Sequence, residues 1–171
     1  HITALPYDIT SPGYYVLDTG CNNVGWDYAI NIVSSDVVLD GNGYVLDGDD
    51  SGTLSNQKCA VSVRDVSNVT ILNLTVLDWY CAIQWNNITD GILMNNNIIS
   101  NNGDGIYIYN SSYNLIINNN ISNNGEGIYV YDSNNNQIKE NTINLNLYGG
   151  IRLYSSAHNT IVNNTFEDLS L

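Results

Sequence analysis

The segment Gly105-Ile-Tyr-Ile-Tyr109 returns twice, as Gly127-Ile-Tyr-Val-Tyr131 and as Gly150-Ile-Arg-Leu-Tyr154. The segments recur at a nearly constant interval, and residues 60–64 and 82–86 fit the same frame upstream. Two further apolar lines keep this period: Ile71, Leu93, Ile116, Ile138 and Ile161, and then Val76, Ile98, Ile121, Ile143 and Phe166. A fixed period of about 22 residues indicates a repeat protein whose units stack on one another.

Apolar and polar residues alternate inside each repeat. Ile106 and Ile108 are apolar, while Tyr107 lies between them and Tyr109 follows. Alternation over four or five residues, bounded by Asn and Gly, predicts a short β-strand. Because one such repeat cannot bury its apolar face alone, we predict an all-β, single-stranded, right-handed parallel β-helix. It would have about six coils of about 22–23 residues, spaced ~4.8 Å apart as strands in a sheet are.

The chain has 171 residues, which is enough for one sizeable core. We predict a single parallel β-helix domain over residues 1–171, with an N-terminal cap and entry at 1–28 and coils at 29–171. Residues 47–57 form a polar excursion that we expect to be a surface loop. Residues 165–171 carry neither a helix signal nor a polar cap, so we expect the last coil to expose open strand edges.

Asparagine is abundant and makes up more than one residue in six of the chain. Asn and Gly tolerate the positive φ angles that tight corners need, and stacked amides can bond to the coils above and below. We therefore predict asparagine ladders at two corners of the coil. One would contain Asn96, Asn119, Asn141 and Asn164, and the other Asp78, Asn101, Asn123 and Asn146.

The charge excludes several functions. Four Lys and Arg face 17 Asp and Glu, for a net charge of -13, so we expect no nucleic-acid partner. No stretch approaches the ~20 apolar residues that cross a bilayer, so we expect no membrane insertion. The start at His1 without Met predicts an extracellular or cell-surface protein after signal-peptide removal. Six sequons are glycosylation candidates: Asn68, Asn73, Asn87, Asn110, Asn120 and Asn163.

Three cysteines are present. Cys59 and Cys81 are one repeat apart and precede matching strands, so they should face each other on adjacent coils. The expected spacing lies within the Cα range of a disulfide, which we predict in preference to two free thiols. Cys21 has no evident partner, and it is either a buried free thiol or a link to another subunit.

Several segments together resemble a known family. They are residues 7–18 (Tyr-Asp-Ile-Thr-Ser-Pro-Gly-Tyr-Tyr-Val-Leu-Asp), residues 37–43 (Val-Val-Leu-Asp-Gly-Asn-Gly) and the Asn-rich coils with Gly-Ile. The chain resembles secreted archaeal parallel β-helix repeat proteins, of the surface-layer or major sheath protein type of methanogens. Related β-helices include carbohydrate-binding and sugar-hydrolase domains that also cover periplasmic copper-insertion proteins. The resemblance implies a scaffold rather than an activity.

Asp104 and Glu126 are the strongest candidates for chemistry. Each directly precedes the glycine of a Gly-Ile strand, so they should stack on adjacent coils and raise one pKa. Such a pair could act on a glycosidic bond. The next equivalent position is Gly149, and no flanking His or Arg completes a site. A lyase base of the Lys or Arg type is not favoured either, since Arg64 and Arg152 belong to widely separated coils without an acidic cluster in frame. We therefore favour solvated corner charges and assign no catalytic residue.

No cofactor or metal site is predicted. His1, His158 and the cysteines lack zinc spacing, and copper would need more soft ligands than Met94. Asp47, Asp49 and Asp50 could hold calcium through their oxygens, although a solvated turn is the favoured interpretation.

Outward-facing aromatic residues form two predicted columns, and we assign them to an interaction face: Tyr107, Tyr109, Tyr129, Tyr131 and Tyr154. These tyrosines could stack on sugars, pack against another subunit or stabilise each other across strands. With the open last coil, this predicts a structural subunit of an extracellular assembly (cell sheath, surface layer or filament) without catalysis. The partners would be copies of the chain, and glycans are also considered. The alternative is a polysaccharide-binding or polysaccharide-cleaving β-helix that uses Asp104 and Glu126.

Overall fold

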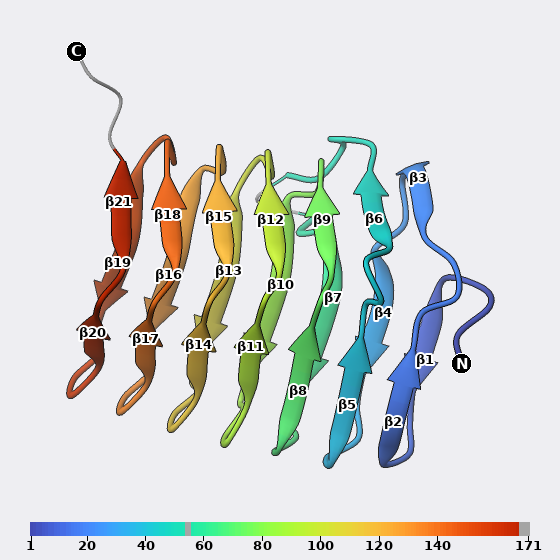
Figure 1. The fold of residues 1–171 in the computed structure, drawn as a ribbon, viewed down its shortest axis with the longest axis horizontal. Helices are drawn as coiled ribbons and strands as arrows, with labels where there is room; N and C mark the ends of the chain where they lie inside the picture. The colour runs from blue at the N-terminus through green and yellow to red at the C-terminus, as the bar shows by residue number, and fades with distance from the viewer. Residues whose placement is uncertain (54–55, 168–171) are drawn as a thin grey trace.

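The structure is a computed structural model that describes residues 1–53 and 56–167. The chain winds into a right-handed parallel β-helix, and its strands form three parallel sheets of seven strands each (Figure 1). All the named elements of the described residues are strands. This confirms the predicted fold class, although the β-helix has seven coils rather than about six.

The three sheets, named A, B and C, are the faces of the solenoid. Sheet A contains β1 (Tyr7–Ile9), β4 (Tyr28–Ile32), β7 (Cys59–Arg64), β10 (Cys81–Asn86), β13 (Asp104–Tyr109), β16 (Glu126–Tyr131) and β19 (Gly149–Tyr154). Sheet B contains β2 (Gly13–Val16), β5 (Val37–Asp40), β8 (Val69–Leu72), β11 (Ile92–Met94), β14 (Leu115–Ile117), β17 (Gln137–Lys139) and β20 (Thr160–Val162). Sheet C contains β3 (Cys21–Val24), β6 (Val45–Gly48), β9 (Thr75–Leu77), β12 (Asn97–Ile99), β15 (Asn120–Ser122), β18 (Thr142–Asn144) and β21 (Thr165–Glu167). Coils 1 to 7 each take one strand from every sheet, in chain order.

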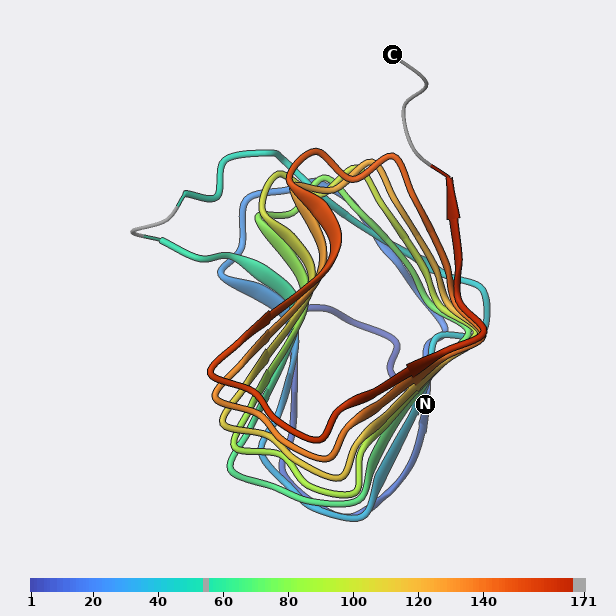
Figure 2. The ribbon, with the colours of Figure 1, turned by 90° about the vertical axis from the view of Figure 1, so that its left-hand side faces the viewer.

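The register follows the predicted period. Ile106 pairs with Ile128, which pairs with Ile151 on the next coil. Ile106 and Ile128 are fully buried, and Ile151 packs against the same core. Figure 2, a view along the solenoid, shows the three faces enclosing this core. Because the apolar residues of each coil lie above those of the last, the core runs as continuous columns through the molecule.

The predicted N-terminal cap is wrong for most of residues 1–28. Strands β1, β2 and β3 lie in that segment and pair in parallel with β4, β5 and β6, so they form coil 1. Their side chains contribute to the core, since Ile9 and Leu17 are fully buried. The repeat was not evident there because these strands lack the Asn-Gly corners and are only three or four residues long.

Buried asparagines form the predicted ladders. The amide nitrogen of Asn119 donates to Oδ1 of Asn141 at 3.0 Å, and the Asn119 backbone N–H donates to the same oxygen at 2.9 Å. Oδ1 of Asn119 in turn accepts from the backbone and amide nitrogens of Asn96. The first predicted ladder, which Asn164 completes, is therefore present.

The second ladder differs from the prediction. It contains Asn101, Asn124 and Asn146, while Asn123 is displaced by one position. Asn123 and Asp78 instead have positive φ angles of 58° and 60°. The shift arises because residues 101–105 contain one residue more than the matching stretch 124–127. Asn114, Asn136 and Asn159 form a third ladder that the sequence pattern did not predict.

The polar excursion connects β6 in coil 2 to β7 in coil 3, and it projects sideways from the corner where sheet C leads into sheet A (Figure 2). Residues 54 and 55 of the predicted loop lie outside the described residues, and so do residues 168–171 of the predicted open C-terminal segment. Within the described part of the chain, no helix has the length and apolar character needed to cross a bilayer.

Candidate functional site

A cleft of about 940 Å³ lies at the corner where the strands of sheet A begin. Four tyrosines line it: Tyr80, Tyr107, Tyr129 and Tyr148. The charged side chains that line the cleft are those of Asp104, Glu126 and Arg152. Three neighbouring coils supply these charged side chains, so the stacking of the repeats creates the site.

Two glycines leave the space between the outer tyrosines open. The Gly103 N–H donates to the Tyr80 carbonyl at 2.8 Å, and the Tyr148 N–H donates to the Gly125 carbonyl at 2.8 Å. A Cβ on Gly103 would lie 2.6 Å from the Tyr80 oxygen, and one on Gly125 would lie 2.6 Å from the Gly103 oxygen. Only glycine fits these close approaches, so no side chain fills the corner between Tyr80 and Tyr148.

Asp104 and Glu126 are stacked, as the sequence predicted. They are register partners on β13 and β16, and the Glu126 side chain is almost entirely buried. Burial raises the pKa of the Asp104 carboxyl to about 7, and the negative charge of Glu126 adds to the effect. Desolvation and a like charge both disfavour the ionised form. Asp104 is therefore a carboxyl group that holds or releases a proton near neutral pH.

Arg152 completes the pair, so the expectation that no arginine does so is wrong. Its Nη1 lies 3.0 Å from Oε1 of Glu126, and its guanidinium carbon lies 5.0 Å from the centre of the Tyr129 ring. Arg152, on coil 7, is the register partner of Tyr129 on coil 6. From there its long side chain reaches diagonally back to Glu126 on coil 6, as long side chains do across strands. The repeat pattern aligned Arg152 with Tyr129 and did not show that its side chain reaches Glu126.

The predicted tyrosine columns are present on sheet A. The rings of Tyr109 and Tyr131 stack with centres 5.4 Å apart, and those of Tyr131 and Tyr154 are 5.2 Å apart. Tyr107 and Tyr129 form the second column at 5.5 Å and also line the cleft. Burial, followed by the charges of neighbouring groups, raises the pKa of Tyr107 to about 12. A role as an interaction face stays a prediction.

Cys59 and Cys81 are register partners, as predicted, but both thiols are free in this structure. The predicted disulfide is therefore not formed in it. The ~4.8 Å spacing of adjacent parallel strands lies within the Cα range of a disulfide, so a disulfide between these two thiols stays a prediction for oxidising conditions. Cys21 is a free, partly buried thiol whose Sγ lies 3.8 Å from the Asp47 carbonyl oxygen. Its intermolecular role stays a prediction.

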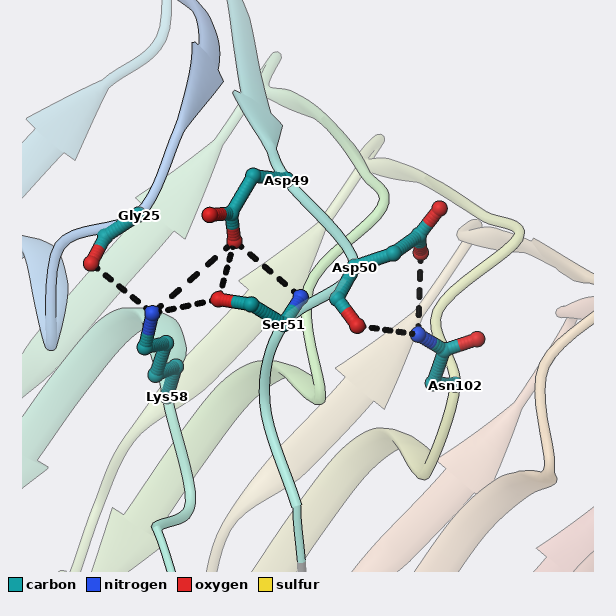
Figure 3. Close-up of polar contacts among 6 residues, drawn as sticks. All are labelled: Gly25, Asp49, Asp50, Ser51, Lys58 and Asn102. Atoms are coloured by element: carbon teal, nitrogen blue, oxygen red, sulfur yellow. Dashed lines mark hydrogen bonds and ion pairs between the residues drawn. The ribbon is translucent and has the colours of Figure 1, made fainter.

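The three aspartates considered for calcium do not converge. Asp49 bonds to Ser51 and lies 3.9 Å from Lys58, whereas Asp50 accepts from Asn102 on the opposite side of the chain (Figure 3). Asp47 lies in β6. All six sequon asparagines are exposed, and their glycosylation stays a prediction.

Comparison with known families identifies the relationship. Residues 7–170 match the family described as periplasmic copper-binding protein (NosD). The chain belongs to the NosD family. This supports the related β-helix group named in the resemblance, whereas the archaeal surface-layer and sheath types are not supported by this match. No curated protein matches this NosD-family chain.

The described residues of this NosD-family chain do not fit a copper centre. They contain no group of three or more His, Cys, Asp or Glu side chains that could share a metal ion. Cys59 and Cys81 are soft ligands, but their mutual hydrogen bond and burial raise the pKa of the Cys81 thiol well above its ordinary value. Copper binds the thiolate, which this environment disfavours. Met94 lies on sheet B, away from both.

Two solved structures share the fold. The enzymatically active domain of tailspike protein 2 from bacteriophage CBA120 has a TM-score of 0.61 at 19% identity, and the match covers 84% of this chain and 25% of that one. A mutant DFA-IIIase from Arthrobacter chlorophenolicus A6, in complex with DFA-III, has a TM-score of 0.73 at 14% identity. That match covers 94% of this chain and 39% of the other.

These structures correct the expectation that the protein is not an enzyme. The coil pattern was taken to indicate a scaffold without catalysis, yet the same fold carries an enzymatically active domain and a DFA-IIIase. The inference from coil pattern to a purely structural protein is therefore wrong. At these identities the likeness establishes the fold alone, and this chain spans well under half of either protein.

Proposed function

We propose that this NosD-family chain binds a polysaccharide in the cleft on sheet A and cleaves it by acid–base chemistry. The observation that carries the proposal is the Asp104 carboxyl, whose pKa of about 7 arises beside the Glu126–Arg152 ion pair inside an aromatic cleft. Carboxyl groups with strongly shifted pKa values in a concave site are typical of active sites.

The three charged residues would divide the work. Cleavage of a glycosidic bond needs one carboxylic acid to protonate the leaving oxygen and one carboxylate to attack or to activate water. Asp104 is suited to be the acid, because its proton is retained up to about pH 7. Glu126 is suited to be the carboxylate, and Arg152 would hold it in position. The ~4.8 Å spacing of adjacent strands is closer to the ~5–5.5 Å carboxyl separation of retaining enzymes than to that of inverting ones.

The tyrosines would supply the binding surface. Aromatic rings present broad apolar faces with a polar edge, which suits the faces and hydroxyls of sugars. Tyr80 and Tyr148 stand at the two sides of the glycine corner, and Tyr107 and Tyr129 lie beside the charged groups. The similarity to an enzymatically active tailspike domain and to a DFA-IIIase with bound DFA-III supports a carbohydrate ligand.

The family description supports a location outside the cytoplasm. The exposed sequons agree with that location. Association of copies of the chain, as in a cell-surface assembly, stays a prediction. Exposed apolar residues of coil 7 support it, namely Ile161, Val162 and Phe166.

Turnover on a panel of neutral and acidic polysaccharides tests the proposal, with release of reducing ends as the measurement. We expect Asp104→Asn to lower turnover by about 10²–10⁴-fold, which is the contribution of a positioned acid, and to leave binding largely unchanged. Asp132→Asn is the matched control, because Asp132 is an exposed aspartate of the same sheet at the corner where its strands end, outside the cleft. Full turnover by Asp104→Asn, or failure of every polysaccharide to bind, would overturn the proposal.

A further inference from the structure

The excursion between β6 and β7 is fixed to corners of several coils. The Asp50 N–H donates to the Asp78 carbonyl at 3.0 Å, at the corner that leads from coil 3 to coil 4. The Asp50 side chain accepts from the amide of Asn102 at 2.9 Å, and its carbonyl accepts from the same nitrogen at 3.2 Å. Asn102 belongs to the next corner, between coils 4 and 5 (Figure 3).

Lys58 fixes the base of the excursion. Its ammonium group donates to the Gly25 carbonyl at 2.8 Å and to the Ser51 hydroxyl, and it lies 3.9 Å from the Asp49 carboxylate (Figure 3). Its side chain is only 13% exposed. Two hydrogen bonds and one ion pair therefore join this partly buried side chain to residues 25 and 49–51. We call Asp49, Asp50, Ser51 and Lys58 the brace.

The brace adjoins the cleft. A Cβ on Gly52 would lie 2.3 Å from the Cβ of Tyr80, so the excursion packs tightly against the tyrosine that bounds one side of the cleft. Gln57 and Asn102 line the cleft at this same end. Neither carboxylate of the brace lines the cleft, and the lining side chains Gln57 and Asn102 are uncharged amides.

The two ends of the cleft differ. From the corner of Gln57 to that of Tyr148 it passes four coil intervals, or about 19 Å at the usual strand spacing. The excursion bounds the first end. At the other end Tyr148 and Leu153 are 73% and 41% exposed.

We propose that the brace, together with Gly52 and Gln57, forms the closed end of the cleft, so that a glycan is held by an uncharged, hydroxyl-bearing chain terminus against Gln57 and Asn102. The rest of the glycan then runs along the solenoid axis past Asp104 towards coil 7. This inference rests on the proposed function, and it adds that the site acts on chain ends rather than on internal segments. A continuing chain at the first end would collide with the backbone held by the brace.

Binding of oligosaccharides with blocked ends tests this inference. The probes are size-graded oligosaccharides from mannan, galactan and fructan, either with both ends free or with a bulky group on one end or the other. Oligosaccharides from alginate are the acidic comparison. We expect blocking one end to weaken binding to the wild-type protein about tenfold or more, and blocking the other to change it less than about twofold.

The brace is tested with Asp50→Ala combined with Lys58→Met. This variant removes the side-chain contact of Asp50 with Asn102 and those of Lys58 with Gly25, Ser51 and Asp49, and it leaves every residue that lines the cleft. We expect the difference between the two blocked forms to fall to about twofold or less. Asp50→Asn is the matched control, because an amide oxygen can still accept from Asn102, and it should keep the wild-type difference. Cleavage of unblocked oligosaccharide by the double variant checks that the Asp104 site is intact.

The outcomes separate the two proposals. If wild-type protein binds and cleaves a glycan but treats both blocked forms alike, the end-recognition inference is overturned and the proposed function stands. If the double variant keeps the full difference between the blocked forms, the brace is not the closed end. If no oligosaccharide binds in any form, both proposals are overturned.

Discussion

Coils 1–3 and coils 4–7 build the same solenoid in two different ways. In coils 4–7 buried asparagines occupy the inner corner positions and bond from coil to coil. In coil 3 the corresponding positions hold Leu74 and Trp79, which are 1% and 2% exposed. The N–H groups of these two residues donate to Asn96 and Asn101, so the ladders end at coil 3. Packed apolar side chains occupy the inner corners of coil 3, whereas hydrogen-bonded asparagines occupy those of coils 4–7.

The difference has a functional counterpart. The regular region brings Asp104, Glu126 and Arg152 into neighbouring positions because its coils differ in length by only about one residue. The irregular region contributes the excursion. Because of it, the register partners Val37 and Val69 are separated by more residues than register partners in the regular coils. The regular coils thus provide the chemical groups, and the irregular ones limit where a ligand can lie.

The largest effect is expected from breaking a ladder. Asn119→Ala removes an amide that bonds to the Leu93 carbonyl and to Asn96 and Asn141, and it leaves several buried groups without partners. At about 1–3 kcal/mol for each such group, we expect the free energy of unfolding to fall by at least about 3 kcal/mol. Urea denaturation would measure it.

Asn120→Ala is the control for that experiment, because Asn120 is exposed and bonds only to Asn97 by its side chain among the contacts described. We expect it to cost less than about 1 kcal/mol. If Asn119→Ala and Asn120→Ala lowered the free energy of unfolding equally, the ladder would not be the feature that distinguishes the two regions.

A smaller effect is expected from pH, and it should be concentrated in coils 4–7. The pKa of Asp104 is raised to about 7 in the fold, against about 3.9 in an unfolded chain, so folding favours its protonated form. The free energy of unfolding should therefore be highest below about pH 4 and should decrease as the pH rises to about 7. Asp104→Asn should remove this decrease and be more stable than wild type at pH 8 by about 2 kcal/mol, roughly half of the ~4 kcal/mol that the full shift would give, because the side chain is partly open to water.

The comparison for pH in the irregular region is Asp78. Burial, with Asp50 and Asp47 next, raises its pKa, but the shift is smaller than that of Asp104. Asp78→Asn should therefore change the pH dependence much less than Asp104→Asn. Thermal unfolding across pH 4–8 would measure both, and a larger effect for Asp78 would contradict the assignment of the titrating site to coils 4–7.

The sequence predicted the regular region well. The Gly-Ile strands, the Ile106–Ile128–Ile151 column and the stacking of Asp104 on Glu126 all follow from a constant offset. Coil 1 escaped prediction because its short strands lack Asn-Gly corners. Arg152 was missed because a long side chain crosses coils diagonally, and the cleft because it depends on Gly103 and Gly125 lying between Tyr80 and Tyr148. Tyrosines that bound a run of corner glycines are a signal that could have found it.

Direct titration of the Asp104 side-chain carboxyl by carbon-13 NMR tests the central claim, that the cleft holds an acid poised near neutral pH. The account predicts a pKa of about 7 in wild-type protein. In Glu126→Gln the pKa should be lower, because the like charge is removed while burial remains. A wild-type value at the ordinary 3.8 of an aspartate, unchanged in Glu126→Gln, would contradict the account.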